Sequence, residues 1–205
     1  MQDKIEVPAY RMLYLDEALQ ENAMMEVIRD VSFASRIEKL QNPDFEKDYV
    51  PDSLKGILRE YQKTGAAWIG TLYSNRFGGI LADDMGLGKT LQVISFLLTE
   101  HTGCSLIVCP ASLVYNWGQE FARFSPEIRV LLIAGTAKER QEQLEEQMRM
   151  EASEGAQVII TSYDLLKRDR EAYLGRTFEY EIIDEAQVIK NAKTQGAKAV
   201  KEISA

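Results

Sequence analysis

The segment Ala82-Asp-Asp-Met-Gly-Leu-Gly-Lys-Thr90 decides the fold class of this chain. It follows the apolar run Gly79-Ile-Leu-Ala82 and opens a stretch with helical spacing that ends at Glu100. Because Gly86 and Gly88 carry no side chain, the loop can curl closely enough to present backbone N–H groups to a phosphate chain at the start of that helix. The sequence therefore predicts a strand, a phosphate-binding loop and a helix, in that order.

The side chains at the end of this loop suit a nucleotide bound with magnesium. We expect Lys89 to reach the β and γ phosphates and the Thr90 hydroxyl to bind Mg²⁺. A strict form of the pattern has glycine where this chain has Asp83, but the strand-loop-helix context supports the same prediction. The loop residues expected to contact the nucleotide are Asp84, Met85, Gly86, Leu87, Gly88, Lys89 and Thr90.

Two adjacent carboxylates, Asp184 and Glu185, end the last apolar run of the chain. Ligands of open α/β sheets bind at the carboxyl ends of the strands, where one carboxylate can hold Mg²⁺ and its neighbour can orient or activate water. Alone, such a pair is more often a helix cap or a surface pair. With a phosphate loop far upstream, it predicts the second half of a nucleotide triphosphatase, with Lys89, Asp184 and Glu185 as the catalytic residues and Thr90 and Asp184 as the metal ligands.

After residue 77, short apolar runs alternate with longer stretches of helical spacing. This alternation indicates βα repeats, and so an α/β fold with a mostly parallel sheet and helices on both faces. The apolar runs are 79–82, 105–109, 128–133, 158–161 and 180–184, and the helical stretches include 89–100, 113–124, 137–150 and 193–203.

The first quarter of the chain has a different pattern. Residues 11–40 have helical periodicity, and residues 41–53 combine two prolines with polar residues, as connectors do. We expect Asp52 or Ser53 to cap a helix that runs through Trp68 toward Leu72. The predicted domains are a helical accessory segment with its linker, 1–50, and a nucleotide-binding lobe, 51–205.

Composition excludes several classes of site. The chain has 205 residues, two cysteines (Cys104 and Cys109) and one histidine (His101). A disulfide framework, a Cys/His zinc site and a Ser-His-Asp triad each need more ligands or a better placed base. The sequence contains neither a long apolar stretch nor a signal-peptide core, so we expect a cytoplasmic protein with no membrane partner.

The charge balance is acidic. Lys and Arg number 24 against 32 Asp and Glu, a net charge of -8, which argues against coating nucleic acid by bulk charge. A local basic strip remains open, and its candidates are Arg123, Lys167, Arg168 and Arg170.

Five short motifs occur in an order that resembles a known family. They are Leu58-Arg-Glu-Tyr-Gln62 followed by Gly65 and Trp68, then Asp83–Thr90, Ile107–Trp117, Ile159–Asp164 and Asp184–Gln187. This order resembles the first P-loop, RecA-like lobe of the sucrose-non-fermenting (Snf) family of helicase-like, DNA-translocating ATPases in superfamily two. The pattern is closest to bacterial members. The resemblance covers 54–205, and residues 1–50 resemble more weakly the accessory region before the motor.

The resemblance implies roles for further residues. Arg59 and Gln62 match the adenine-reading motif. The other positions match two DNA-contacting motifs, whose hydroxyls and loop amides suit phosphate contacts that position a strand without reading its bases. These positions are Pro110, Ala111, Ser112 and Asn116, with Trp117, in the first motif and Thr161, Ser162 and Tyr163 in the second. The implied cofactors are ATP and Mg²⁺, and the implied partners are the phosphate backbone of double-stranded DNA and a second RecA-like lobe.

Two departures from the family pattern bear on activity. Gln187 stands where many relatives have histidine, so the contacts of this motif are expected to differ. The family's third motif is expected after residue 203 and the sequence ends at Ala205, so we expect a fragment that binds ATP but hydrolyses it poorly. Two alternatives remain: another superfamily-two motor lobe, such as an RNA helicase or a restriction motor subunit, and a scaffold module that binds nucleotide without hydrolysis.

Overall fold

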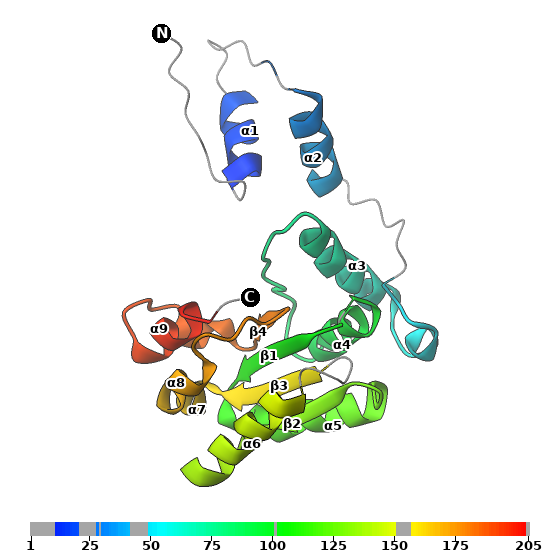
Figure 1. The fold of residues 1–205 in the computed structure, drawn as a ribbon. Coiled ribbons are helices and arrows are strands. Elements are labelled where there is room, and N and C mark those ends of the chain that lie inside the picture. The colour runs from blue at the N-terminus through cyan, green and yellow to red at the C-terminus, as the bar shows by residue number, and fades with distance from the viewer. Residues whose placement is uncertain are drawn as a thin grey trace.

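The computed structural model describes residues 11–20, 28, 30–41, 49–100, 102–150 and 157–203 (Figure 1). None of the helices in these ranges is both long and apolar enough to cross a membrane. The helices are α1 (Met12–Gln20), α2 (Val31–Gln41), α3 (Glu60–Ser74), α4 (Lys89–Glu100), α5 (Val114–Phe124), α6 (Ala137–Met150), α7 (Tyr163–Arg168), α8 (Arg170–Tyr173) and α9 (Gln195–Lys201). The strands are β1 (Cys104–Cys109), β2 (Arg129–Leu132), β3 (Gln157–Ser162) and β4 (Glu181–Ile183).

The strands form one parallel sheet in the order β2-β3-β1-β4. Its register aligns Cys109 of β1 with Ser162 of β3, and Val108 of β1 with Ile183 of β4. The strands β1, β3 and β4 therefore end at the same edge of the sheet. The predicted α/β class with a parallel sheet is confirmed.

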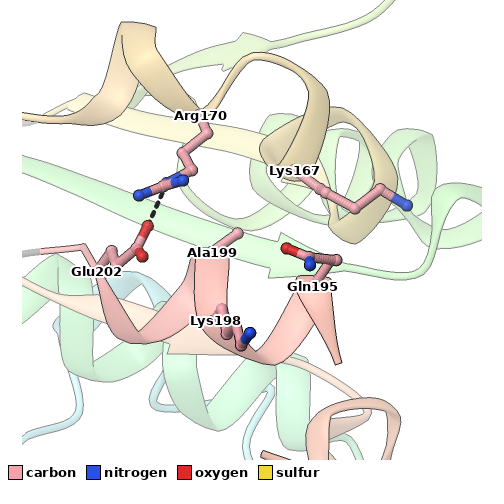
Figure 2. A pocket seen from close by; sticks show the side chains of 6 residues that line it. All are labelled: Lys167, Arg170, Gln195, Lys198, Ala199 and Glu202. Carbon is pink, nitrogen blue, oxygen red and sulfur yellow. Dashed lines mark ion pairs between the residues drawn. The ribbon is translucent and has the colours of Figure 1, made fainter. Parts of the chain in front are cut away.

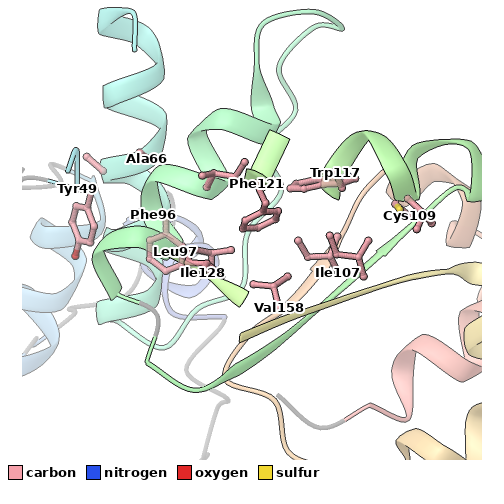
Figure 3. Close-up of a cluster of buried hydrophobic side chains, with 14 residues drawn as sticks. Tyr49, Ala66, Phe96, Leu97, Ile107, Cys109, Trp117, Phe121, Ile128 and Val158 are labelled. Carbon is pink, nitrogen blue, oxygen red and sulfur yellow. The ribbon is translucent and has the colours of Figure 1, made fainter. Parts of the chain in front are cut away.

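Helices cover both faces of the sheet, because side chains of a strand point alternately to opposite faces. On one face, Ile107 and Val158 pack against α3, α4 and α5 (Figure 3). On the other face, Leu106, Val108 and Ile159 pack against α6, α7, α8 and α9. The two cores fix the positions of the loops at the carboxyl edge.

The predicted strand 79–82 is not present. Its residues form no strand, and Ile80 is 80% exposed. Instead, Gly79 lies against Leu72 and Trp68 of α3, where an added Cβ would be 2.1 Å from a Leu72 methyl carbon. An apolar run becomes a strand only beside a strand that completes its hydrogen bonds. The segment before the phosphate loop is therefore irregular.

The helix expected from about residue 54 begins later, at Glu60. Asp52–Leu54 forms a separate 3₁₀ turn, and Leu54 is buried. The start of α3 is set by Gln62, whose Oε1 accepts the Arg59 N–H at 2.9 Å. The expected helices 89–100, 113–124 and 137–150 agree with α4, α5 and α6 to within one residue, whereas α9 is shorter than the expected 193–203.

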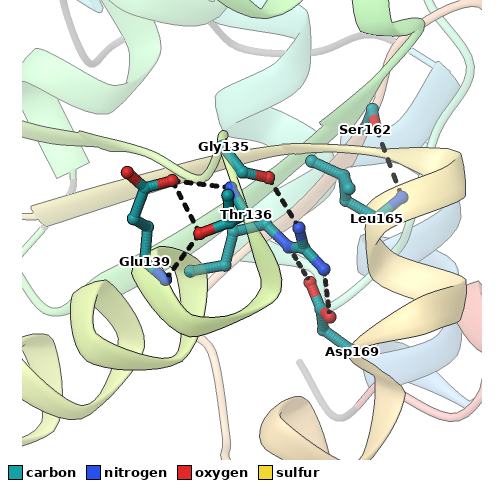
Figure 4. Close-up of polar contacts among 7 residues, drawn as sticks. Gly135, Thr136, Glu139, Ser162, Leu165 and Asp169 are labelled. Atoms are coloured by element: carbon teal, nitrogen blue, oxygen red, sulfur yellow. Dashed lines mark hydrogen bonds and ion pairs between the residues drawn. The ribbon is translucent and has the colours of Figure 1, made fainter.

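A buried ion pair joins α6 to the segment between α7 and α8 (Figure 4). The guanidinium of Arg140, on α6, donates to both carboxylate oxygens of Asp169, at 2.5 and 2.8 Å, and to the Gly135 carbonyl at 2.7 Å. Gly135 has a φ of 96°, a conformation that glycine adopts without strain. This pair fixes α7 against α6.

The expected helical segment before residue 50 is present in part, as α1 and α2. The expected helical residues 21–27 and 29 and most of the connector, 42–48, lie outside the described residues, as does His101. Tyr49 packs in the core of the lobe beside α3, and its carbonyl accepts the Ser95 hydroxyl at 2.7 Å. The end of the expected connector is therefore part of the lobe. Cys104 and Cys109 are both free thiols.

Candidate nucleotide and DNA site

The phosphate loop has the backbone that its glycines predict. Gly86 and Gly88 have φ values of 84° and 72°, and α4 begins directly afterwards at Lys89. Lys89 Nζ donates to the carbonyls of Asp83 and Asp84, at 2.7 and 3.1 Å. The ammonium group therefore lies within the curl of its own loop, at the N-terminal end of a helix whose N–H groups favour an anion.

Gln62 connects α3 to this loop. Its side chain is 7% exposed, and its Nε2 donates to the Leu87 carbonyl at 3.0 Å, while its Oε1 accepts from Arg59. The amide keeps one N–H and one lone pair for a further partner. Gly88 is required beside it, because an added Cβ would be 2.3 Å from Gln62 Nε2. The expected adenine-reading residue is thus fixed to the phosphate loop, while Arg59 is exposed.

A second glutamine, Gln92, forms a hydrogen bond with the phosphate loop, and the sequence patterns did not predict it. Gln92, on the buried face of α4, is fully buried and donates from Nε2 to Asp83 Oδ2 at 3.0 Å. Gly65 of α3 makes room for it, because an added Cβ would be 1.8 Å from Gln92 Oε1. A polar residue in the apolar stripe of α4 was the available signal. Asp83, the departure from the strict pattern, is therefore part of the loop's support.

Asp184 lies at the carboxyl edge where β1, β3 and β4 end. Its N–H donates to the Val108 carbonyl at 2.9 Å, which extends the pairing of β4 with β1. The Trp117 indole N–H donates to Asp184 Oδ2 at 2.8 Å, and the Tyr163 hydroxyl donates to the Asp184 carbonyl at 2.6 Å. The expected metal ligand is therefore held by residues from both expected DNA-contacting motifs.

Glu185 follows in a left-handed conformation, with φ 53° and ψ 49°. Its N–H donates to Asp184 Oδ1 at 2.9 Å, and its carboxylate accepts a hydrogen bond from the Gln187 amide. Non-glycine residues at positive φ are uncommon and are enriched at functional sites. Gln187, which replaces the family's histidine, thus contacts the expected water-activating group directly.

Burial changes the acidity of two groups at this edge, Cys109 and Tyr163, and of Glu181 at the start of β4. Burial, with a smaller contribution from Asp184, raises the pKa of the Cys109 thiol to about 12, so this thiol is not a nucleophile at neutral pH. Burial also raises the pKa of Tyr163 above its ordinary value, and Asp184 adds to this effect, so its hydroxyl remains a donor. Burial raises the pKa of Glu181, on β4, to about 7.

The expected DNA-contacting residues differ in exposure. Ala111, Ser112 and Asn116 are exposed on the turn and helix that follow β1. Thr161, Ser162 and Tyr163 are buried, and the Ser162 hydroxyl accepts the Leu165 N–H to cap α7. Pro110, which directly precedes Ala111, is half-buried. The expected contacts stay predictions, and the exposure directs them to the segment from Ala111 to Asn116.

Two candidates for the basic strip line one pocket of about 100 Å³ between α7, α8 and α9 (Figure 2). Lys167 and Arg170 lie on one side, and Lys198 lies on the other, on α9. Arg170 forms an ion pair with Glu202, and Lys167 forms one with Asp164 at 3.0 Å. Arg123, a third candidate, lies on α5 over the Phe124 ring. The pocket has no lining residue in common with the phosphate loop.

The donor groups fit a magnesium ion that is held mainly by a nucleotide. Mg²⁺ is bound through one or two carboxylates with waters and substrate phosphates, rather than by an all-protein cage. Asp184 offers a carboxylate and Thr90 a hydroxyl. Among the described residues there is no group of three or more His, Cys, Asp or Glu side chains that could hold a metal alone.

Comparison with known sequences finds relatives named as helicases. The chain is 43% identical over 166 residues to Helicase ssl-1 of Caenorhabditis elegans, which covers 78% of this chain and 7% of that protein. It is 37% identical over 204 residues to an ATP-dependent helicase of Mycoplasma pneumoniae, which covers 97% of this chain and 19% of that protein. The chain therefore spans less than a fifth of these relatives, and they do not single out bacterial members.

A solved structure has the same fold. The SWI2/SNF2 ATPase core of Sulfolobus solfataricus, in complex with double-stranded DNA, aligns with a TM-score of 0.65 and 34% identity, over 78% of this chain and 32% of that chain. The lobe is thus a RecA-like lobe of the kind found in that core. The model of the SNF2-related domain matches residues 61–205, and this chain belongs to the SNF2-related family of helicase-type ATPases.

Proposed function

We propose that residues 51–205 form the ATP-binding lobe of a motor that hydrolyses ATP and translocates along double-stranded DNA. One observation supports the proposal: Trp117 and Tyr163, from the two segments expected to contact DNA, both donate hydrogen bonds to Asp184, the expected metal ligand. An ATPase that responds to DNA needs such proximity. The family membership and the DNA-bound Sulfolobus relative support the same function.

The chain's own residues divide the work on the nucleotide. Lys89 exchanges its two loop carbonyls for phosphate oxygens, and the N–H groups of Gly86 and Gly88 line the same curl. Gln62 presents its remaining N–H and lone pair to the adenine edge. Asp184 and Thr90 hold Mg²⁺, which neutralises charge on the phosphates when bound. Glu185 orients the attacking water, and Gln187 holds its carboxylate.

Duplex DNA is the proposed partner, bound through its phosphate backbone. The exposed turn from Ala111 to Asn116 offers hydroxyl, amide and backbone N–H groups, which position a strand without reading its sequence. The pocket of Lys167, Arg170 and Lys198 offers three basic groups, two of which form ion pairs with Asp164 and Glu202, on a chain whose net charge is -8. Local charge of this kind makes binding strongly dependent on salt.

We also propose that these 205 residues bind ATP but hydrolyse it slowly. The resemblance assigns the transition-state arginines to a second RecA-like lobe, and such an arginine contributes about 10³- to 10⁵-fold in rate. We propose in addition that a domain boundary lies near residue 50, that residues 1–50 are an accessory segment, and that the chain is most like bacterial members of the family.

The test measures nucleotide binding and turnover of the chain with two variants. Lys89→Ala should weaken binding of a fluorescent ATP analogue with Mg²⁺ by about 100-fold or more, because a charge-assisted contact to the phosphates is lost. Glu185→Gln should leave binding within about twofold and remove residual hydrolysis. Binding to a duplex of about 20 base pairs should weaken steeply as salt rises.

Equal affinity of the wild type and Lys89→Ala would overturn the nucleotide site. Hydrolysis unchanged in Glu185→Gln would remove this residue from catalysis. Nucleotide binding with no turnover at all in the wild type would make a scaffold module the better interpretation. DNA-stimulated turnover by the chain at about 1 per second or faster, the ordinary range of enzymes, would contradict the proposed need for the second lobe.

A further inference from the structure

Asp184 is bonded at two atoms by aromatic side chains that come from two other segments. Trp117, on α5, reaches its carboxylate at 2.8 Å across 67 residues of sequence. Tyr163, the first residue of α7, reaches its carbonyl at 2.6 Å across 21 residues. The parallel register of β1, β3 and β4 is what brings these three points together.

These bonds leave the carboxylate little freedom. Oδ2 accepts from Trp117, and Oδ1 accepts from the Glu185 N–H at 2.9 Å. Each carboxylate oxygen has a second lone-pair site, so both can still face a cation. Hydrogen bonds to a ligating carboxylate orient it, and their loss typically costs 10- to 100-fold in metal affinity or activity.

The two aromatic side chains are themselves held firmly. Trp117 is 4% exposed and lies against Phe121, with ring centroids 6.1 Å apart (Figure 3). Tyr163 is 9% exposed and packs in the core on the opposite face of the sheet. A displacement of either element would therefore move the donor that orients Asp184, because a packed core transmits displacement rather than absorbing it.

Each element also reaches the surface close to its aromatic residue. Asn116, which precedes Trp117 on α5, is exposed, as is Ser112 on the turn that leads into this helix. Asp164 and Lys167, on α7 after Tyr163, are exposed as well. A DNA strand that contacts these surfaces thus touches the same two elements that bond to Asp184, α5 at its carboxylate and α7 at its backbone carbonyl.

We propose that Trp117 and Tyr163 are positioning residues that couple DNA contact at α5 and α7 to the orientation of the metal-binding carboxylate of Asp184. The inference rests on the proposed function and adds the route by which DNA acts on the ATP site. Coupling between two sites is reciprocal in binding free energy. DNA therefore tightens binding of Mg²⁺·ATP, and Mg²⁺·ATP tightens binding of DNA, through these two hydrogen bonds.

The first experiment uses the unmodified chain. Its two tryptophans, Trp68 and Trp117, give two indole N–H signals in a nitrogen-15 NMR spectrum. We expect the Trp117 signal to shift when Mg²⁺ and a non-hydrolysable ATP analogue are added, and to shift again with a short DNA duplex. The Trp68 signal serves as the internal control. The proposal is overturned if both ligands bind and the Trp117 signal shifts with neither of them.

The second experiment measures affinity for the ATP analogue with Mg²⁺ and in EDTA. Trp117→Phe and Tyr163→Phe should each reduce the gain from Mg²⁺ by about tenfold and leave binding in EDTA unchanged. In the wild type the duplex should raise Mg²⁺·ATP affinity by about fivefold or more, and each variant should lose most of this increase. Trp68→Phe is the matched control, expected to keep both effects.

The outcomes separate the inference from the proposed function. A wild-type chain that binds no Mg²⁺·ATP overturns the proposed function. A wild type that binds, with both phenylalanine variants keeping the gain from Mg²⁺ and from DNA, overturns the coupling alone. Tyr163→Phe removes only a hydroxyl, so it decides the question even if the buried Trp117→Phe fails to fold.

Discussion

The two halves of the candidate site use left-handed backbone in different ways. The phosphate loop places it on Gly86 and Gly88, whose φ values are 84° and 72° and which pay no steric penalty there. The carboxylate half places it on Glu185, with a φ of 53°. A side chain with a Cβ in this region costs about 1–2 kcal/mol. Glycine is sufficient in the phosphate loop, where backbone groups are expected to bind the ligand. At the carboxylate turn the side chain of Glu185 is needed, so the strained conformation is kept on a residue with a Cβ.

The halves also differ in how their acidic groups are satisfied. Asp83, beneath the phosphate loop, accepts a hydrogen bond from the buried Gln92. Glu181, on β4, has a buried Oε1 without a hydrogen-bond partner among the described residues, and its pKa is raised to about 7 by burial. Each half thus has one buried side-chain oxygen without a hydrogen-bond partner among the described residues, Gln92 Oε1 beneath the loop and Glu181 Oε1 on β4. Only the carboxylate half places left-handed backbone on a residue with a Cβ, Glu185.

The largest expected effect is the loss of folding stability when Gly88 is replaced by alanine. In Gly88→Ala, the new Cβ meets Gln62 Nε2 at 2.3 Å in addition to the strain of positive φ, whereas in Gly86→Ala it meets nothing within 4 Å. We expect Gly86→Ala to cost about 1 kcal/mol and Gly88→Ala about 2–3 kcal/mol. The second change corresponds to a fall in Tm of roughly 5–10 °C, measured by thermal unfolding.

A double-mutant cycle isolates the contact with Gln62. In a Gln62→Ala background the clash is gone, so Gly88→Ala should cost only the backbone strain, the same as Gly86→Ala. A cost for Gly88→Ala that is independent of residue 62 would show that the clash does not contribute and that backbone strain alone separates glycine from alanine in this loop.

The next effect has the opposite sign and concerns Glu185. Glu185→Gly should relieve strain and raise stability by about 1 kcal/mol, a rise in Tm of roughly 2–4 °C, while hydrolysis is lost. Arg76 is the matched control, because its φ of 58° lies in the same region but outside the site. Arg76→Gly should raise Tm by a similar amount and leave nucleotide affinity unchanged. A fall in Tm for Glu185→Gly alone would mean that its bonds to Asp184 and Gln187 outweigh the strain.

The sequence predicted the features that local patterns set, and it failed where a contact with another segment decides the structure. The loop at 82–90, the parallel sheet and the helices α4, α5 and α6 follow from local patterns: glycine spacing and the periods of apolar residues. The predicted strand 79–82 failed because pairing depends on a neighbour, not on the run itself. The predicted start of α3 was too early, because the helix is capped by the Gln62 bond to Arg59 and not by Asp52 or Ser53.

The contacts of Asp184 lie beyond any local pattern. The Trp117 bond joins residues 67 apart, and it depends on the register of three strands. The sequence could identify Asp184 and Glu185 as a pair, but it gave no signal for the left-handed conformation of Glu185 or for its bond to Gln187. Family resemblance assigned Tyr163 to DNA, which stays a prediction, and it gave no sign that the buried Tyr163 hydroxyl donates to the Asp184 carbonyl.

The smallest expected effect tests the unpaired carboxylate of Glu181 through pH. Its pKa is about 7 in the folded chain against 4.5 as its ordinary value, so between these values the folded chain holds more protons than the unfolded one. Stability should therefore fall as pH rises from about 4.5 to 7 and then level off. Glu181→Gln imitates the protonated form and should remove this slope. At pH 8 it should raise Tm by about 2 °C, corresponding to less than about 1 kcal/mol after allowing for the exposed part of the side chain.

The control is Glu142→Gln, an equal change of charge on the exposed face of α6, which should leave the slope in place. Parallel pH profiles for the wild type and Glu181→Gln would show that the carboxylate finds a partner in solution, and the contrast between the two halves would then rest on Glu185 alone.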